Sequence, residues 1–278
     1  MVIWIGEGSL GSLVPDDEAL VSALDHGFTV GDGVFETMKV ADGQAFALTR
    51  HLRRLDRSAE ALGLTVPDHA VIREAVSEVL FANAPAITGP ARARITLTGG
   101  IAPLGSDRGD AQPTLVVAVM PTAAWPETTS VATVPWVRNE RSAVAGAKTT
   151  SYAENVVALE HAHARGASEA IFANTLGRLC EGTGSNIFVV LDGMTLTPRL
   201  DSGCLAGITR ELVLEWTDAQ EADLDIEVLK SADEIFLTSS TRDVHAVTRV
   251  DDRVLDVGPM TSRIREIFRR RSSADLDP

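Results

Sequence analysis

Hydrophobic and polar positions follow two different periods along residues 1–120. Short apolar runs flank Ala41-Asp42-Gly43, a composition that is typical of a tight hairpin turn. Apolar residues then recur at helical spacing from Leu48 to Leu62, and Gly63 follows as a helix stop. The pattern predicts strands over 34–40, 44–48, 93–98 and 114–120 and helices over 48–62 and 67–83.

A linker follows this alternating part of the chain. The segment Pro121-Thr122-Ala123-Ala124-Trp125-Pro126-Glu127 combines two prolines with small residues, as interdomain linkers do. Beyond it, the pattern predicts strands over 130–138, 169–173, 187–191, 194–197 and 234–237 and helices over 152–165, 208–216 and 262–271. We therefore expect a small α/β domain over residues 1–120, a linker over 121–127 and a larger domain over 128–278.

The composition narrows the class of protein. Hydrophobic residues make up 45% of the chain, which is enough to build buried cores. The formal net charge of −14, from 25 Lys and Arg against 39 Asp and Glu, opposes binding to nucleic-acid phosphates. No apolar run approaches the roughly 18 residues of a membrane helix, and the first residues lack the pattern of a signal peptide. We expect a soluble, cytoplasmic protein whose partners are neither nucleic acids nor membranes.

Two motifs that often mark cofactor or metal sites have simpler interpretations here. Gly6-Glu7-Gly8-Ser9-Leu10-Gly11 has the spacing of a dinucleotide-binding loop, but Val14-Pro15 follows where a helix should begin, so we interpret it as a turn. His161 and His163 point in different directions on the predicted helix and cannot share a metal ion. We expect no metal site.

Lys148 is the strongest candidate for chemistry. It lies among small uncharged residues, between a predicted strand and a predicted helix, and no other lysine occurs between Lys39 and Lys230. A desolvated lysine amine acts as a nucleophile or a base. The alternative interpretation is an ordinary solvated loop lysine, and the sequence pattern favours neither.

Other segments offer an acid and places to hold an anion. Glu181 begins Glu181-Gly182-Thr183-Gly184-Ser185-Asn186 between two predicted strands, and an acid fixed against a pyridine nitrogen keeps that nitrogen protonated. Ile208 and Thr209 open a predicted helix after Gly207, so that their amides point towards an anion. The hydroxyls of residues 238–241 end a predicted strand, and Arg54 offers a bidentate counter-charge. Each segment alone is also compatible with an ordinary loop.

Taken together and in this order, these motifs resemble the fold-type IV pyridoxal-phosphate enzymes. That family includes branched-chain aminotransferase, D-amino-acid aminotransferase and aminodeoxychorismate lyase. The resemblance implies a two-domain α/β or α+β fold with a small N-terminal domain and a larger C-terminal pseudo-barrel domain. It also implies a homodimer, with pyridoxal 5′-phosphate bound between the domains. The residues that carry the resemblance are Asp25-His26-Gly27-Phe28, Gly31-Asp32-Gly33-Val34-Phe35-Glu36, His51-Leu52-Arg53-Arg54-Leu55, Lys148, Glu181 to Asn186, Gly207-Ile208-Thr209-Arg210 and Thr238 to Thr241.

The resemblance also implies a role for each matching residue. Lys148 corresponds to the Schiff-base lysine, Glu181 to the partner of the pyridine nitrogen, and Arg54 to the phosphate anchor. The remaining implied cofactor-binding residues are Asn186, Leu205 against the ring face, Ile208 and Thr209 through their amides, and Ser240 or Thr241 through a hydroxyl.

The implied reaction moves an amino group between a small amino acid, of D or branched-chain type, and a 2-oxo acid. The alternative is 4-amino-4-deoxychorismate lyase, which releases 4-aminobenzoate and pyruvate. D-amino-acid enzymes carry an arginine just after the strand that ends here at Thr98, where this chain has Gly99 or Gly100. The candidate substrate residues are Phe35, Thr37, Arg94 and Arg138. Phe35 lies at the position of a tyrosine in D-amino-acid enzymes, and Thr37 lies near the position of a threonine in the lyases.

Overall fold

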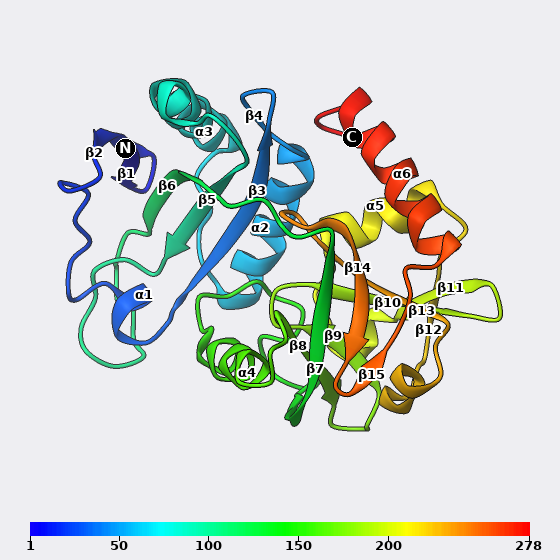
Figure 1. Cartoon of the computed structure of the whole chain (residues 1–278). Helices are drawn as coiled ribbons and strands as arrows, with labels where there is room; N and C mark the ends of the chain where they lie inside the picture. The colour runs from blue at the N-terminus through cyan, green and yellow to red at the C-terminus, as the bar shows by residue number, and fades with distance from the viewer. The chain divides into compact units, whose positions relative to one another are not determined.

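The computed structural model describes residues 1–278, which form two compact units (Figure 1). Unit 1 consists of residues 1–124, 147–152 and 276–278, and unit 2 consists of residues 125–146 and 153–275. The first division between the units, between Ala124 and Trp125, falls inside the linker expected over 121–127. None of the helices combines the length and apolarity that a membrane-spanning segment requires.

Unit 1 is built on a six-stranded antiparallel sheet with the strand order β2-β1-β6-β5-β3-β4. One face of the sheet forms a hydrophobic core with α2 and α3, because alternate strand residues such as Val34, Met38 and Ile95 point to the same side. The elements are β1 (Val2–Glu7), β2 (Leu10–Pro15), α1 (His26–Thr29), β3 (Gly33–Ala41), β4 (Gln44–Ala45), α2 (Leu48–Leu62), α3 (His69–Asn83), β5 (Ala91–Thr98) and β6 (Thr114–Pro121).

Turn chemistry explains two connections in this sheet. Asp42 and Gly43 join β3 to β4 with φ of 48° and 72°, the left-handed backbone that a tight hairpin requires. The glycine-rich segment 6–11 closes the β1–β2 hairpin, in which Gly6 faces Gly11. That segment is therefore a turn, as the sequence indicates.

The segment that carries Lys148 packs in unit 1, although the sequence places it within the second domain. Strand β4 pairs only with the last residues of β3, so the beginning of β3 has an open edge. Residues 148–150 take this edge: Phe35 N donates to Lys148 O at 3.0 Å, and Thr150 N donates to Gly33 O at 2.8 Å. Local sequence patterns do not indicate such a pairing between distant segments.

The last residues of the chain also belong to unit 1, at the beginning of α2. Ala47 precedes this helix with φ of 55°, and its side chain makes no capping hydrogen bond. Asp277 supplies the missing acceptor, since its Oδ1 accepts a hydrogen bond from Thr49 N at 2.8 Å. A residue from the far end of the sequence thus caps the helix that carries Arg54.

Unit 2 is built on a nine-stranded mixed sheet with the order β12-β11-β10-β13-β14-β7-β8-β9, in which β15 pairs with β14. Val131 and Ala132 are neighbours in β7 and belong to separate hydrophobic clusters, so both faces of this strand are covered. The elements are β7 (Thr128–Arg138), α4 (Ala153–His163), β8 (Glu169–Asn174), β9 (Leu179–Gly182), β10 (Asn186–Leu191), β11 (Met194–Pro198), α5 (Ile208–Trp216), β12 (Gln220–Ala222), β13 (Glu234–Ser239), β14 (Asp243–Val250), β15 (Arg253–Val254) and α6 (Pro259–Ala274).

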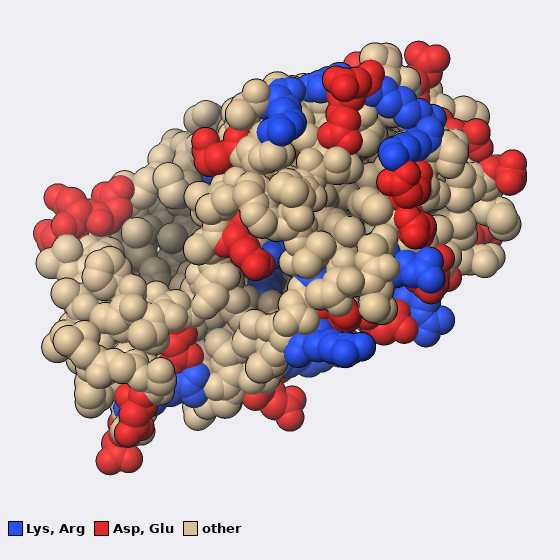
Figure 2. All heavy atoms as spheres, turned by 90° about the horizontal axis from the view of Figure 1, so that it is seen from below, with Lys and Arg blue, Asp and Glu red and all other residues tan.

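Charged side chains of both signs lie next to one another on the surface. On the face drawn in Figure 2, lysine and arginine side chains are interspersed with aspartate and glutamate. Among the ion pairs of exposed side chains, Arg269 pairs with Glu266 at 2.7 Å, one helical turn away. Such exposed pairs contribute little to stability.

Candidate active site

The amine of Lys148 lies over an aromatic side chain in unit 1. Its Nζ is 4.3 Å from the ring centroid of Phe35 and 5.9 Å from that of Tyr152, and the two rings meet edge to face. The backbone of Lys148 is fixed on both sides, because its N donates to Ser58 Oγ at 3.0 Å and its O accepts from Phe35 N. A fixed backbone with the amine over an apolar ring is a setting in which a lysine acts as a nucleophile.

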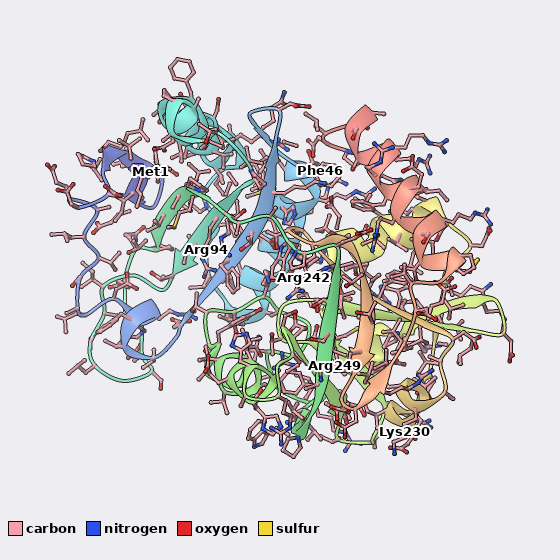
Figure 3. All side chains as sticks on the ribbon, viewed as in Figure 1. Met1, Phe46, Arg94, Lys230, Arg242 and Arg249 are labelled. Carbon is pink, nitrogen blue, oxygen red and sulfur yellow. The ribbon has the colours of Figure 1, made fainter.

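Arg94 brings a second cation to the same ring. Its guanidinium carbon lies 3.7 Å from the centroid of Phe35, and its Nε donates to Thr96 Oγ1 at 3.1 Å. Arg94, labelled in Figure 3, lies in β5, and Thr37 is its partner in β3 across the strand pairing. Both residues alternate with core residues and therefore point to the sheet face opposite the core. Three of the candidate substrate residues, Phe35, Thr37 and Arg94, therefore lie near Lys148 in unit 1.

Arg54 is buried in a charge cluster that the sequence does not predict. Only 4% of Arg54 is exposed, and its Nε and NH2 donate to Glu36 Oε1 and Oε2 at 2.9 and 2.6 Å. His51 Nδ1 contacts the same Oε2 at 2.6 Å. Burial alone favours the neutral acid, but the charges and hydrogen bonds of Arg54 and His51 outweigh it and lower the pKa of Glu36 to about 2. Glu36 is therefore a carboxylate at neutral pH.

Glu181 is held from two directions in unit 2. It lies in β9, and its Oε2 accepts a hydrogen bond from Leu205 N at 2.9 Å. Arg138, a candidate substrate residue, lies beside it, with Nε at 3.3 Å from Glu181 Oε1 and the guanidinium stacked on Phe172 at 4.1 Å. A neighbouring guanidinium favours the charged form of a carboxylate. The structure therefore places Arg138 next to the acid expected to meet the pyridine nitrogen.

Asn186 organises the loop before α5. Its Nδ2 donates to Leu205 O at 2.8 Å, and its Oδ1 approaches Gly207 so closely that a Cβ there would lie 1.9 Å away. Any larger residue at position 207 would therefore displace the Asn186 side chain. Gly207 is the N-cap of α5 and no side chain caps the helix, so Ile208 and Thr209 start it with their amides directed outward for an acceptor.

The hydroxyl segment lies beside Asn186 in the same unit. Strands β10 and β13 pair with Asn186 opposite Thr238, whose buried hydroxyl has no hydrogen-bond partner. Ser240 and Thr241 follow in the turn between β13 and β14. Unit 2 thus brings an acid, a helix N-terminus and hydroxyl groups together, which is the set of groups that a phosphorylated pyridine requires.

A further buried acid, Glu169, supports the turn after Glu181 and has no recognisable motif. Its Oε1 accepts a hydrogen bond from Thr183 N at 2.9 Å, and its Oε2 accepts one from Ser185 Oγ at 3.0 Å. Arg242, which follows the hydroxyl segment, lies 3.8 Å from the same carboxylate. In the sequence, Glu169 is marked only by its position at the start of a predicted strand.

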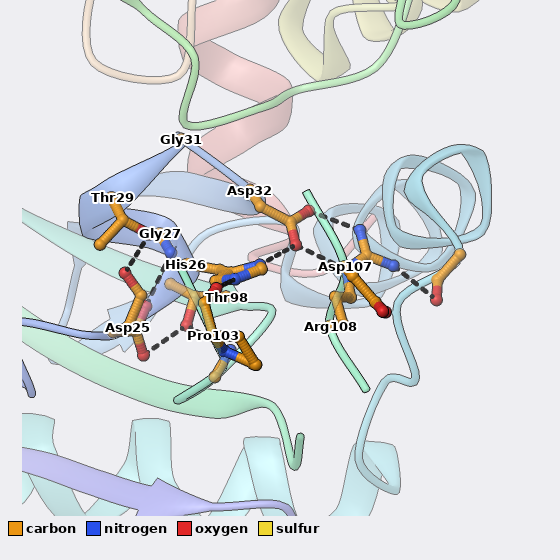
Figure 4. A network of polar contacts seen from close by, with 12 residues as sticks. Asp25, His26, Gly27, Thr29, Gly31, Asp32, Thr98, Pro103, Asp107 and Arg108 are labelled. Carbon is orange, nitrogen blue, oxygen red and sulfur yellow. Dashed lines mark hydrogen bonds and ion pairs between the residues drawn. The ribbon is translucent and has the colours of Figure 1, made fainter. Parts of the chain in front are cut away.

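The Asp25-His26 motif forms a separate polar network in unit 1 (Figure 4). Asp25 is fully buried and accepts hydrogen bonds from Thr98 Oγ1 at 2.9 Å and from Thr114 Oγ1 at 2.8 Å. His26 Nε2 contacts Pro103 O at 2.8 Å, and Arg108 binds Asp32 with two nitrogens. These contacts tie the loop after β5 to the segment before β3.

Comparison with known proteins identifies the family of the chain. Residues 33–250 match the family profile of amino-transferase class IV. The chain belongs to the class IV aminotransferase family. It is 33% identical to a putative branched-chain-amino-acid aminotransferase of Methanocaldococcus jannaschii, over 93% of each chain. It is 30% identical to D-alanine aminotransferase of Staphylococcus haemolyticus, over 94% of this chain and 95% of that one.

A solved structure of the family shows the same fold. A hypothetical aminotransferase from Mycobacterium tuberculosis, in its PLP-bound form, superposes with a TM-score of 0.85 at 28% identity, over 97% of this chain and 98% of that one. The same protein has also been solved with alpha-ketoglutarate and PMP bound. The expected fold class, a two-domain fold-type IV enzyme of the aminotransferase family, is therefore confirmed.

Proposed function

We propose that this protein is a pyridoxal-phosphate-dependent aminotransferase that transfers the amino group of a small branched-chain amino acid to a 2-oxo acid. The observation that carries the proposal is the pair of cations on Phe35. The amine of Lys148 and the guanidinium of Arg94 lie 4.3 and 3.7 Å from one ring centroid. An amine for proton transfer and a guanidinium for a carboxylate are the two groups that an amino acid substrate needs.

The residues present fit pyridoxal phosphate. Lys148 offers an amine for the aldehyde, and Glu181 offers a carboxylate for the ring nitrogen. Arg54, the uncapped start of α5 at Ile208 and Thr209, and the hydroxyls of Ser240 and Thr241 offer donors for the phosphate. The buried hydroxyl of Thr238 has no hydrogen-bond partner, and a bound phosphate nearby would supply an acceptor.

The protein residues have separate tasks in the proposed reaction. When bound, the cofactor acts as an electron sink for the substrate carbon that loses its proton. The amine of Lys148 removes that proton and returns it, and Glu181 keeps the ring nitrogen protonated. Arg94 binds the substrate carboxylate and so orients the carbon towards Lys148.

The loop after β5 supports a branched-chain substrate over a D-amino acid. The carboxylate-binding arginine of D-amino-acid enzymes corresponds to Gly99 or Gly100 in this chain. A Cβ at Gly99 would lie 2.3 Å from Asp32 Oδ2, and one at Gly100 would lie 1.8 Å from Gln112 O. Gly100 also has φ of 76°, which disfavours any side chain. An arginine at either position would need a rearranged loop.

The substrate assignment is tested with three sets of substrates. We expect L-leucine, L-valine and L-isoleucine with 2-oxoglutarate to yield the corresponding 2-oxo acids. We expect D-alanine to react at least about tenfold more slowly, because the chain lacks the loop arginine that binds the carboxylate in D-amino-acid enzymes, and a lost charge-assisted hydrogen bond costs about that factor. Aminodeoxychorismate alone is the third substrate. Formation of 4-aminobenzoate without a 2-oxo acid would identify a lyase and contradict the proposal, and faster turnover of D-alanine would contradict the substrate class.

We also propose that the protein is a homodimer, which the resemblance implies. Exposed apolar side chains in two segments of unit 1, Leu20, Leu24 and Phe28 in one and Ile101 and Leu104 in the other, support this assembly. Phe28 and Leu104 are 77% and 78% exposed, and exposed apolar surface marks interaction sites where it is extensive. We expect light scattering to give twice the mass of one chain, and Phe28→Ser to shift the protein towards monomer. A wild-type monomer would contradict the assembly.

A further inference from the structure

Glu36 occupies a position in β3 where the fold calls for an apolar side chain. Strand residues alternate between the two faces of a sheet, so Glu36 points to the same side as Val34 and Met38. Those two residues are fully buried members of the hydrophobic core that α2 and α3 cover. Glu36 is itself 0% exposed. A carboxylate in such a place is unfavourable unless every oxygen is paired.

Helix α2 carries a row of buried polar side chains, a polar stripe, on the face that packs against Glu36. His51, Arg54 and Ser58 are buried at positions three and four residues apart, so they lie on one face of the helix. Arg54 binds both oxygens of Glu36. His51 contacts Oε2, and since a carboxylate only accepts hydrogen bonds, Nδ1 is the donor. Two charged residues and a histidine are thus fully paired inside an otherwise apolar interface.

Stability alone does not explain this cluster. Replacement of a buried ion pair by apolar side chains of similar volume is often neutral or stabilising, so a retained pair calls for another explanation. The geometry offers one, because Glu36 binds Nε and NH2 of Arg54 and so fixes the plane of the guanidinium. Ser58, one turn further along the same stripe, accepts a hydrogen bond from Lys148 N. The stripe therefore fixes the proposed phosphate anchor and the backbone of the proposed reactive lysine together.

We propose that Glu36 and His51 are positioning residues that hold the Arg54 guanidinium in the orientation that binds the phosphate of the cofactor. This inference rests on the proposed function, which takes pyridoxal phosphate as that cofactor. Arg54 is fixed in advance by neighbours that do not touch the ligand, so that no side-chain ordering has to accompany phosphate binding.

The phosphate group itself provides the test. Pyridoxal lacks the phosphate and shares the rest of the cofactor, so the ratio of the two dissociation constants measures the contribution of the phosphate site. We expect Glu36→Gln, titrated as apoprotein, to bind pyridoxal phosphate about 10–100-fold more weakly, by analogy with the loss of a residue that orients a metal ligand. We expect its affinity for pyridoxal to stay close to that of the wild type, because the effect is confined to the phosphate.

Two further variants keep the test decisive. His51→Gln retains a hydrogen-bond donor at a different distance from Glu36, and we expect a smaller loss of affinity for pyridoxal phosphate relative to pyridoxal. This variant replaces Glu36→Gln in the test if Glu36→Gln does not fold. Glu60→Gln alters an exposed acid on the same helix and should leave both dissociation constants unchanged. Inorganic phosphate should compete with pyridoxal phosphate less effectively on Glu36→Gln than on the wild type.

The outcomes separate the inference from the proposed function. Equal losses of affinity for pyridoxal phosphate and pyridoxal would show a general structural role and overturn the inference, as would an unchanged ratio of the two constants. A wild-type protein that binds neither molecule would instead overturn the proposed function.

Discussion

Lys148→Ala is expected to lower aminotransferase turnover by at least about 10³-fold, because the variant loses the group proposed both to bind the cofactor aldehyde and to transfer the substrate proton. The surroundings of Lys148 should change little, since its backbone contacts with Ser58 and Phe35 do not involve the removed amine. Single-turnover kinetics with L-leucine measures the loss directly. Folding is checked by the unfolding midpoint, which we expect to stay close to that of the wild type.

The chain offers a matched control for this variant. Its only other lysines are Lys39 and Lys230. Lys230 lies on the surface of unit 2, where it pairs with Glu227 (Figure 3). Lys230→Ala should retain full turnover and the visible absorbance of the lysine-bound cofactor. A Lys148→Ala protein that keeps more than about a tenth of the activity would show that another group transfers the proton, because general acid–base catalysis is worth about 10²-fold or more.

Glu181→Gln is expected to lower kcat by about 10²–10³-fold, the range seen when one preorganised electrostatic partner is removed from an active site. Glutamine keeps an oxygen for the hydrogen bond from Leu205 N but loses the charge that stabilises a protonated ring nitrogen. The variant also removes one of the two carboxylates beside Arg138, which keeps its ion pair with Glu154. We therefore expect the absorbance of the bound cofactor to change along with kcat.

An acid elsewhere on unit 2 controls for the loss of one charge. Glu266 lies on the exposed side of α6, where it pairs with Arg269. Glu266→Gln should leave kcat and the cofactor absorbance as they are in the wild type. If Glu181→Gln keeps the wild-type kcat, the carboxylate does not serve the ring nitrogen and its role is limited to holding Leu205.

Elements with clear local signals could be predicted from the sequence. The helix expected over 48–62 is α2, which ends at Gly63 with φ of 66°, and the helix expected over 208–216 is α5. Both carry an apolar stripe and a terminating or initiating glycine. The strand expected over 44–48 shrinks to Gln44–Ala45, because Ala47 already turns into α2. The helix expected from residue 262 begins at Pro259, since proline suits the first turn of a helix.

Long-range contacts could not be predicted in this way. The motifs indicate Lys148, Glu181 and Arg54, but not that Lys148 packs against β3 and α2. The sequence does not mark Glu36 as a functional residue, because its contacts are with Arg54 and His51, which lie on the next long helix. Likewise, the contact of Arg138 with Glu181 joins two strands that are far apart in the sequence. Such groupings follow from strand pairing and helix docking, which local patterns do not encode.

The account depends most directly on Lys148 as the lysine that binds the cofactor. Borohydride reduction of the protein with pyridoxal phosphate converts the bond between cofactor and lysine into a stable one, and mass spectrometry of the peptides then locates it. We predict that the added mass lies on the peptide with Lys148 and is absent from the peptides with Lys39 and Lys230. Modification of Lys39 or Lys230 instead, or of no lysine, would contradict the account.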